Sequence, residues 1–269
     1  MQTPDALSTA LLRRLILLSA VIFAIAIGYS QTAIGWGQNP AEFSADSDET
    51  LKVASYAFAI WGLIYLGLFA HAVFQLLPQG RDRPLTEALG WPAVGALLGI
   101  GWWVVAAALD AETTTIILIF ASLLVILIPL LLKARQIRAL GRKNPELWLT
   151  AWPLMMLAGW LTIAAPVNLL TVVTGNQALP DVLPPTLWAI IAVVVVSVTA
   201  LAVTARLRQI AYALPISWGL LAVFVAEQPR NSLLAYVALT AAVAVLVAAV
   251  ILSFRLQPAR NTPPADPQG

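Results

Sequence analysis

The chain of 269 residues contains no cysteine and a single histidine, His71. Disulfide bonds and thiolate metal sites are therefore excluded, and so is any metal site that needs several histidines. Charged residues are also scarce, at 10% of the sequence, against roughly 25% in soluble domains. Hydrophobic residues make up 60% of the chain, and the mean hydropathy is +0.86. This composition indicates an integral membrane protein whose partner is the lipid bilayer and not nucleic acid.

Eight apolar runs approach the length of about 20 residues that a membrane-spanning helix needs. The expected spans are 15–34, 53–77, 89–109, 116–132, 148–173, 188–204, 211–225 and 233–254. The seventh run is short and contains Pro215, so a re-entrant segment and a total of seven spans form the alternative. The predicted fold class is an all-α polytopic membrane protein.

The distribution of basic residues favours eight spans with both ends of the chain in the cytoplasm. On that arrangement thirteen of the fifteen Lys and Arg residues lie on the inner side, and only Lys52 and Arg230 lie on the outer side. Cytoplasmic loops are the ones that carry such an excess of positive charge. Without the seventh span, Arg208 and Arg255 would fall on opposite sides of the membrane.

The sequence lacks the motifs of several enzyme classes. It has no GxxxxGK[ST] phosphate-binding loop, no HExxH zinc motif and no GxSxG nucleophile elbow. All 13 acidic residues fall outside the expected spans, and ion-coupled transporters generally need charged groups within them. We therefore predict that the protein is not an enzyme or an ion-coupled pump, and that it needs no catalytic residue, metal or cofactor.

Aromatic residues are the most informative feature of the spans. Five of the ten tryptophans lie near expected span ends and are typical of the interfacial belt. The other five lie deeper in the membrane: Trp61, Trp102, Trp103, Trp160 and Trp218. Aromatic walls with one or two polar groups suit a flat, mostly apolar ligand. The alternative is a well-packed aromatic core, which is the commoner arrangement in helical bundles.

The fifth span places three of its residues on one face. Trp160, Ala164 and Asn168 follow one another at intervals of four, and Trp61 and Tyr65 have the same interval in the second span. An indole and an amide at this depth are costly if they face lipid. We predict that the two faces line a buried pocket; the alternative is that Trp160 fills a gap and Asn168 hydrogen-bonds a neighbouring helix.

Two further features bear on such a pocket. The loop 35–52 is polar and longer than a minimal turn, so it either folds over the bundle as a lid or is an ordinary solvated loop. His71 is the one residue able to ligate haem iron, but it lies roughly 80° around the helix from Trp61. We expect His71 to be hydrogen-bonded within the bundle or to reach the inner headgroups.

These patterns resemble the tryptophan-rich sensory protein family, also called the translocator protein or TspO/MBR family. The resemblance covers about residues 11–173 and rests on the W-x3-Y pair of the second span, the tryptophan pair of the third and the W-x3-A-x3-N series of the fifth. It implies a five-helix bundle of a bacterial inner membrane, with a pocket under the first long loop that binds porphyrins or haem. It also implies a sensory or regulatory role.

The resemblance implies ligand-binding roles for particular residues. Of the tryptophan pair in the third span, one member is expected to match the family's aromatic position. The candidates are Trp61, Tyr65, Trp102, Trp103, Trp160, Ala164 and Asn168. Two departures leave the ligand open. The prolines that usually precede the family's second-span tryptophan are absent before Trp61, and small residues replace the third-span asparagine.

The expected organisation has four parts. They are a cytoplasmic N-terminus at 1–10, a TspO-like bundle at 11–173 with its outer loop at 35–52, three additional transmembrane helices at 174–254, and a disordered cytoplasmic tail at 255–269. The predicted function is to bind a flat porphyrin-like or tetrapyrrole-like ligand. Alternatives are a passive carrier of apolar molecules and a structural or assembly subunit, and a homodimer or a membrane-protein partner is compatible with each.

Overall fold

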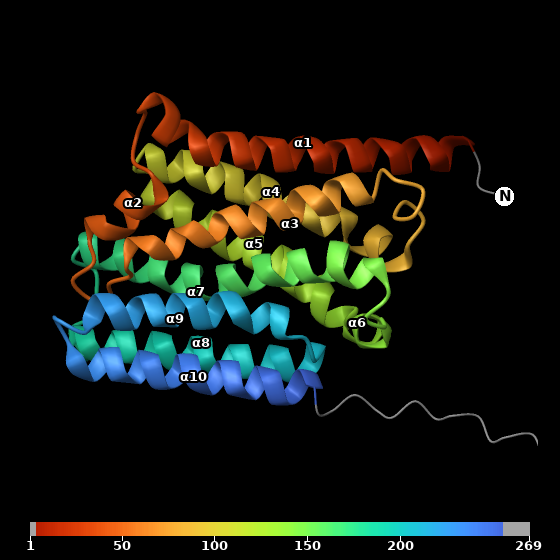
Figure 1. The fold of residues 1–269 in the computed structure, drawn as a ribbon. Helices are drawn as coiled ribbons and strands as arrows, with labels where there is room; N and C mark the ends of the chain where they lie inside the picture. Colours follow the sequence, from red (N-terminus) through yellow and green to blue (C-terminus); the bar gives the residue numbers. More distant parts are fainter. Residues whose placement is uncertain (1–3, 255–269) are drawn as a thin grey trace, which may run out of the picture.

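The computed structural model of the protein describes residues 4–254, and all regular structure in this range is helical. The helices run side by side along one axis (Figure 1), with short connections at the two ends of the bundle. We name these ends after the short helices that they carry, α2 (Pro40–Asp46) at one end and α6 (Ala134–Ala139) at the other. The predicted disordered tail at 255–269 lies outside the described residues.

Eight helical segments are long and apolar enough to cross a membrane, as the sequence predicts. Five of them consist of one α-helix: α1 (Pro4–Ile34), α4 (Pro84–Ala108), α5 (Glu112–Leu132), α8 (Pro185–Leu207) and α10 (Ser232–Phe254). The other three begin with a short turn of different pitch: η1 (Ser55–Ala59) before α3 (Ile60–Phe74), η2 (Leu147–Ala151) before α7 (Trp152–Gly175), and η3 (Ile210–Tyr212) before α9 (Ala213–Glu227). The chain is therefore a polytopic membrane protein.

The two short helices lie in segments that the sequence reading treats as loops. Helix α2 begins with a capping box, in which the Asn39 side chain accepts hydrogen bonds from the amides of Ala41 and Glu42, at 2.9 and 3.0 Å. The Glu42 carboxylate in turn accepts from the Asn39 amide at 2.8 Å. With Pro40 at the first helical position, this Asn-Pro-x-Glu series is a helix-start signal that is visible in the sequence.

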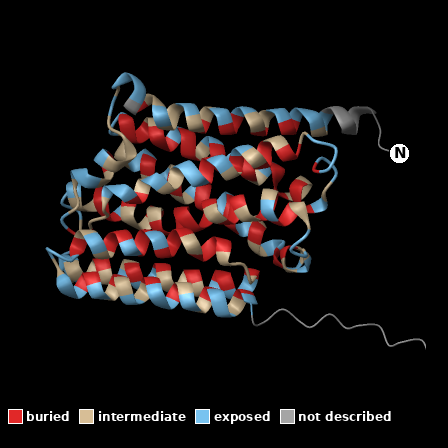
Figure 2. Cartoon of the chain, viewed as in Figure 1, coloured by how far each residue is buried: buried red, intermediate tan, exposed pale blue. Residues whose placement is uncertain are grey.

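Helix α7 lies near the middle of the bundle. On one side of α7 lie α3 and α4, which separate it from α1. On the other side lie α8, α9 and α10 (Figure 1). Buried residues concentrate in α4, α7 and α9, whereas α1, α8 and α10 expose more of their surface (Figure 2). One hydrophobic core includes buried residues from all eight spans, so the three C-terminal helices share it with the first five.

The contact between α7 and the start of α9 is especially close. A Cβ atom at Gly159 would lie 2.1 Å from the carbonyl oxygen of Tyr212. The Thr162 and Tyr212 hydroxyls form a buried hydrogen bond of 2.7 Å beside it. Only glycine allows the two backbones to approach this closely, as small residues do at helix interfaces in membranes.

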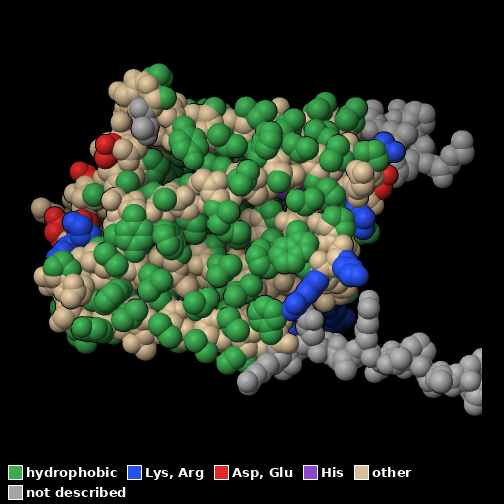
Figure 3. Space-filling view, in the orientation of Figure 1, with side chains coloured by type: hydrophobic (Ala, Val, Ile, Leu, Met, Phe, Trp, Pro, Cys, Tyr) green, Lys and Arg blue, Asp and Glu red, His purple; other side chains and the backbone are tan. Residues whose placement is uncertain are grey.

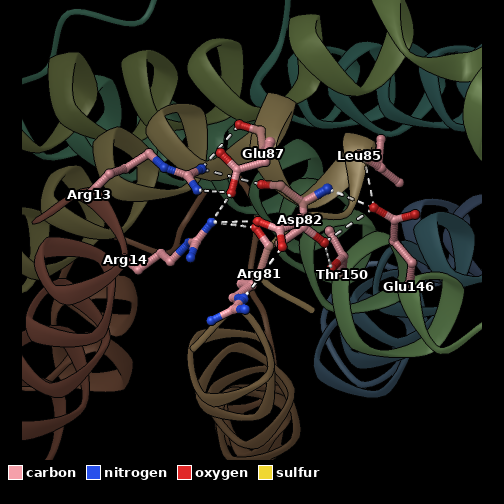
Figure 4. Close-up of polar contacts among 9 residues, drawn as sticks. Arg13, Arg14, Arg81, Asp82, Leu85, Glu87, Glu146 and Thr150 are labelled. Carbon is pink, nitrogen blue, oxygen red and sulfur yellow. Dashed lines mark hydrogen bonds and ion pairs between the residues drawn. The ribbon is translucent and has the colours of Figure 1, made fainter. Parts of the chain in front are cut away.

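On the α1 side of the α6 end, charged groups are paired within the protein (Figure 4). Arg13 and Arg14 of α1 both donate to Glu87 of α4, at 2.8 and 2.7 Å. Arg13 is almost fully buried, and Gly90 leaves room for it, because a Cβ there would lie 1.5 Å from Arg13 Nη1. The Glu146 carboxylate accepts hydrogen bonds from the first turn of α4, including the Leu85 amide at 2.8 Å. These contacts hold α1, α4 and the start of η2 together.

We predict that Gly159→Ala weakens the contact between α7 and η3. Overpacking of this kind costs about 1–3 kcal/mol in the free energy of unfolding, which denaturation of the purified protein in mixed micelles would measure. Gly141→Ala is the control, because a Cβ at Gly141 has no atom within 4 Å. Equal stability of the two variants would contradict the close approach.

Candidate functional site

A cavity lies toward the α2 end of the bundle, between α3, α4, α5 and α7. Its empty space, including the part that is open at its mouth, is about 670 Å³. Seventeen residues line it, none of them charged; most are apolar, and Ser44, Asn168 and Thr171 are the polar ones. The cavity is therefore an uncharged, mainly apolar hollow within the membrane-spanning part of the protein.

Three tryptophans from three helices line this cavity: Trp61 of α3, Trp103 of α4 and Trp160 of α7. The ring centroids of Trp61 and Trp160 are 6.2 Å apart, with the planes 79° to each other. Phe58 makes a similar edge contact with Trp160, at 6.1 Å. The second, third and fifth spans thus turn an indole toward one hollow, and the aromatic rings support one another edge to face.

Asn168 is the main polar group of the cavity wall and also links three helices. Its Oδ1 accepts a hydrogen bond of 3.1 Å from Trp103 Nε1, and its Nδ2 donates one of 3.0 Å to Thr115 Oγ1 of α5. Ala164 and Trp160 line the cavity on the same face of α7. Asn168 therefore combines the two predicted roles: it hydrogen-bonds neighbouring helices, and it borders the cavity. An amide can form four hydrogen bonds, and these two contacts use two of them.

Two of the seven predicted site residues do not line the cavity. Tyr65 is buried behind Trp61, on which its ring stacks at 5.1 Å, and it packs toward Gly28 of α1. Trp102 is 55% exposed and lies beside Phe23 of α1, with ring centroids 5.7 Å apart. Adjacent residues in a helix point about 100° apart, so only one of the paired tryptophans reaches the hollow. Trp102 is therefore the outward-facing member of the pair.

His71 also lies outside the cavity lining. It is fully buried on α3, and its Nδ1 is 3.0 Å from the Leu149 carbonyl oxygen of η2. The expectation of a histidine hydrogen-bonded within the bundle is confirmed. The residues that line the cavity therefore include no imidazole.

The segment 35–52, here called the lid, folds over the cavity instead of extending into solvent. Pro40, Phe43 and Ser44 of α2 form part of the cavity wall. Phe43 is only 3% exposed, and its ring makes an edge contact of 6.1 Å with Trp103. The lid thus contacts one of the three indoles directly.

The lid is anchored to the turn between α9 and α10, a connection that sequence reasoning missed. The Lys52 amide donates to the buried Glu227 carboxylate at 2.6 Å. Arg230 donates to the carbonyl oxygens of Asp48 and Glu49, at 3.1 and 3.3 Å. The acidic residues of the lid and the single cation of the turn, Arg230, were visible in the sequence, but nothing there indicates which loops meet.

The C-terminal helices also contribute to the cavity itself. Gly219 of α9 is one of its lining residues, and a Cβ there would lie 2.7 Å from Ile163 of α7. Trp218, the fifth of the deep tryptophans, donates from its Nε1 to the Ala57 carbonyl oxygen at 2.9 Å, which holds η1 against α9. Phe58, which follows Ala57, is therefore positioned in the cavity wall partly by α9.

Comparison with known proteins identifies one family. The family described as TSPO-like protein matches residues 14–251. The matched region includes most of α1, the lid, the four spans that enclose the cavity and the greater part of the three C-terminal helices. No curated protein and no solved structure matches the chain.

We predict that Asn168→Leu destabilises the protein by about 1–3 kcal/mol, because it leaves the buried Trp103 N–H without its acceptor. A double-mutant cycle with Trp103→Phe tests the hydrogen bond between the two side chains. A coupling energy of about 0.5–3 kcal/mol is expected for residues in one hydrogen-bond network. Denaturation in mixed micelles measures both. Strictly additive effects would contradict a direct bond between these side chains.

We predict that Arg230→Gln loosens the lid. A partly exposed ion pair contributes at most about 1 kcal/mol, so amide hydrogen exchange within α2 should become up to about fivefold faster. Arg83→Gln is the control, since Arg83 also donates to a backbone carbonyl, that of Gln79, but at the α6 end. Unchanged exchange in α2 would show that the α9–α10 turn does not hold the lid.

Proposed function

The chain belongs to the family of TSPO-like proteins, and we propose that this multi-pass membrane protein binds a flat apolar ligand of the porphyrin or tetrapyrrole class beneath its lid. The observation that carries the proposal is the meeting of Trp61, Trp103 and Trp160 around one uncharged cavity. Three indoles from three separate helices offer several ring faces and edges to a planar molecule.

The chemistry of the wall limits what such a ligand carries. Burying a carboxylate against uncharged, mainly apolar residues is costly, so acidic substituents of a porphyrin would have to remain at the mouth, near the lid. The free hydrogen-bonding positions of Asn168 suit a single polar group at the ligand's edge. Recognition would then depend on stacking and shape, with one hydrogen bond for orientation.

A sensory role is supported by the way in which the lid connects the cavity with the C-terminal helices. Phe43 of the lid touches Trp103, and the end of the lid is bonded to Glu227 and Arg230 beside α10. A ligand that displaced Phe43 would change these contacts. If the lid has two positions, with Phe43 against Trp103 or displaced from it, a ligand shifts the balance between them only if it binds one position more tightly than the other.

We further propose that both chain ends face the cytoplasm of a bacterium and that the lid lies on the other side of its inner membrane. Basic residues gather at the α6 end, whereas Lys52 and Arg230 are the only ones at the α2 end within the described residues. This asymmetry is the one expected when the α6 end is cytoplasmic. Proteolysis of the lid in vesicles of known orientation would test it.

We predict that the purified protein binds protoporphyrin and that Trp103→Phe or Trp160→Phe weakens binding about two- to tenfold, the value of an aromatic contact. The neighbouring Trp102→Phe serves as the matched control, because its ring points away from the cavity, and it should leave the Kd unchanged. The Kd is measured from the absorbance of the porphyrin and from quenching of tryptophan emission. The neutral dimethyl ester should bind at least as tightly as the free acid.

Equal affinities for the wild type and all three variants would contradict binding in the cavity. In that case, protein-dependent flux of porphyrin across liposomes would favour a passive carrier. Co-purification of a membrane complex, without any effect of porphyrin, would instead favour a structural subunit.

A further inference from the structure

The cations at the α6 end form two groups that differ in their partners. On the α1 side, Arg13 and Arg14 are paired with Glu87, and Arg81 is paired with Asp82 at 3.4 Å. On the α6 side, six cations have no carboxylate partner among residues 4–254, and they lie in the segment 133–146 and at the end of α8, which contacts α6: Lys133, Arg135, Arg138, Arg142, Lys143 and Arg206. We call this group the basic patch.

The patch has no internal source of negative charge. Glu146 is the sole carboxylate between residues 133 and 146, and it is almost fully buried. Its Oε1 accepts hydrogen bonds from the amides of Leu85 and Thr86, so it serves the first turn of α4. In the space-filling view, Lys and Arg side chains stand together at this end beside a largely apolar flank (Figure 3).

The patch lies at the level where the spans end. Lys133 directly follows the last residue of α5, and Arg206 belongs to the last turn of α8. The Arg142 guanidinium lies 5.1 Å from the centre of the Phe254 ring, at the end of α10. Cations at the ends of three membrane-spanning helices are at the depth of lipid headgroups.

Apolar side chains extend from the patch toward the membrane interior. Leu132 is 76% exposed and Phe254 is 56% exposed, each beside a cation of the patch. Helix α6 fixes part of this arrangement, because Ala134 and Ile137 are buried while Arg135 is exposed. The surface therefore places positive charge above exposed hydrocarbon, which complements an anionic headgroup above its acyl chains.

We infer that the basic patch binds anionic phospholipid, with Lys133, Arg135 and Arg206 meeting the headgroup phosphate and the exposed side chains of Leu132 and Phe254 meeting the acyl chains. Basic pockets between transmembrane helices hold such headgroups, and each nearby cation strengthens the attraction. The interaction does not depend on the aromatic cavity, which lies toward the other end of the bundle.

The test compares two double variants that each remove two positive charges from the α6 end. Lys133→Gln/Arg135→Gln alters the patch, whereas Arg81→Gln/Arg83→Gln alters cations that have partners within the protein. Each protein is purified with equal amounts of phosphatidylglycerol and phosphatidylcholine, and native mass spectrometry counts the lipids retained. At about fivefold per cation, the patch variant should lose roughly 25-fold in its preference for phosphatidylglycerol, and the control should keep it.

Melting temperatures in phosphatidylcholine alone verify that both variants are folded. Equal retention of the two lipids by the wild type, or equal losses in the two variants, would overturn the proposal. Competition by millimolar inorganic phosphate that releases the lipid completely would also overturn it, since it would identify a site for a free anion. Continued retention of phosphatidylglycerol in phosphate supports the lipid.

Discussion

A polar amide inside a membrane span must be hydrogen-bonded within the protein, because lipid offers it no partner. Asn168 meets this requirement by joining Trp103 of α4 and Thr115 of α5 to α7. The first of these bonds turns the Trp103 indole inward, beside Trp160 and below Phe43 of the lid. The shape of the cavity therefore depends on one side chain, which hydrogen-bonds two neighbouring helices and also lines the cavity.

The second constraint is the close packing between α7 and the span formed by η3 and α9. Gly159 allows the backbone at Tyr212 to approach, and Gly219 brings α9 against Ile163. The same helix pair supplies a cavity residue and, through Glu227 and Arg230, the anchor of the lid. The C-terminal region therefore belongs to the site through α9 and the turn that follows it, which agrees with a family match that continues to residue 251.

Much of this arrangement could be predicted from the sequence, since it depends on local periodicity and composition. The eight spans follow from apolar length, and the shared face of Trp160, Ala164 and Asn168 follows from a spacing of four residues. Whether Trp102 or Trp103 faces the cavity depends on which helices pack against each side of α4. The spacing of residues along the sequence does not contain that information. The roles of Gly219 and Arg230 likewise depend on tertiary contacts between distant segments. The capping box at Asn39 is a local sequence signal, so helix α2 could have been predicted from the sequence but was not.

The central proposal is that a ligand binds against the three indoles beneath the lid, so that crosslinking the lid to α7 should slow its entry. The absence of cysteine allows a direct test with Ser47→Cys/Gly175→Cys, because a Cβ at Gly175 would lie 3.2 Å from that of Ser47, slightly below the roughly 3.5–4.5 Å of a disulfide. Oxidised protein should form this crosslink and take up protoporphyrin much more slowly than the reduced form, with normal uptake restored by reductant. Equal uptake by the oxidised and reduced forms of the crosslinked variant would contradict the account.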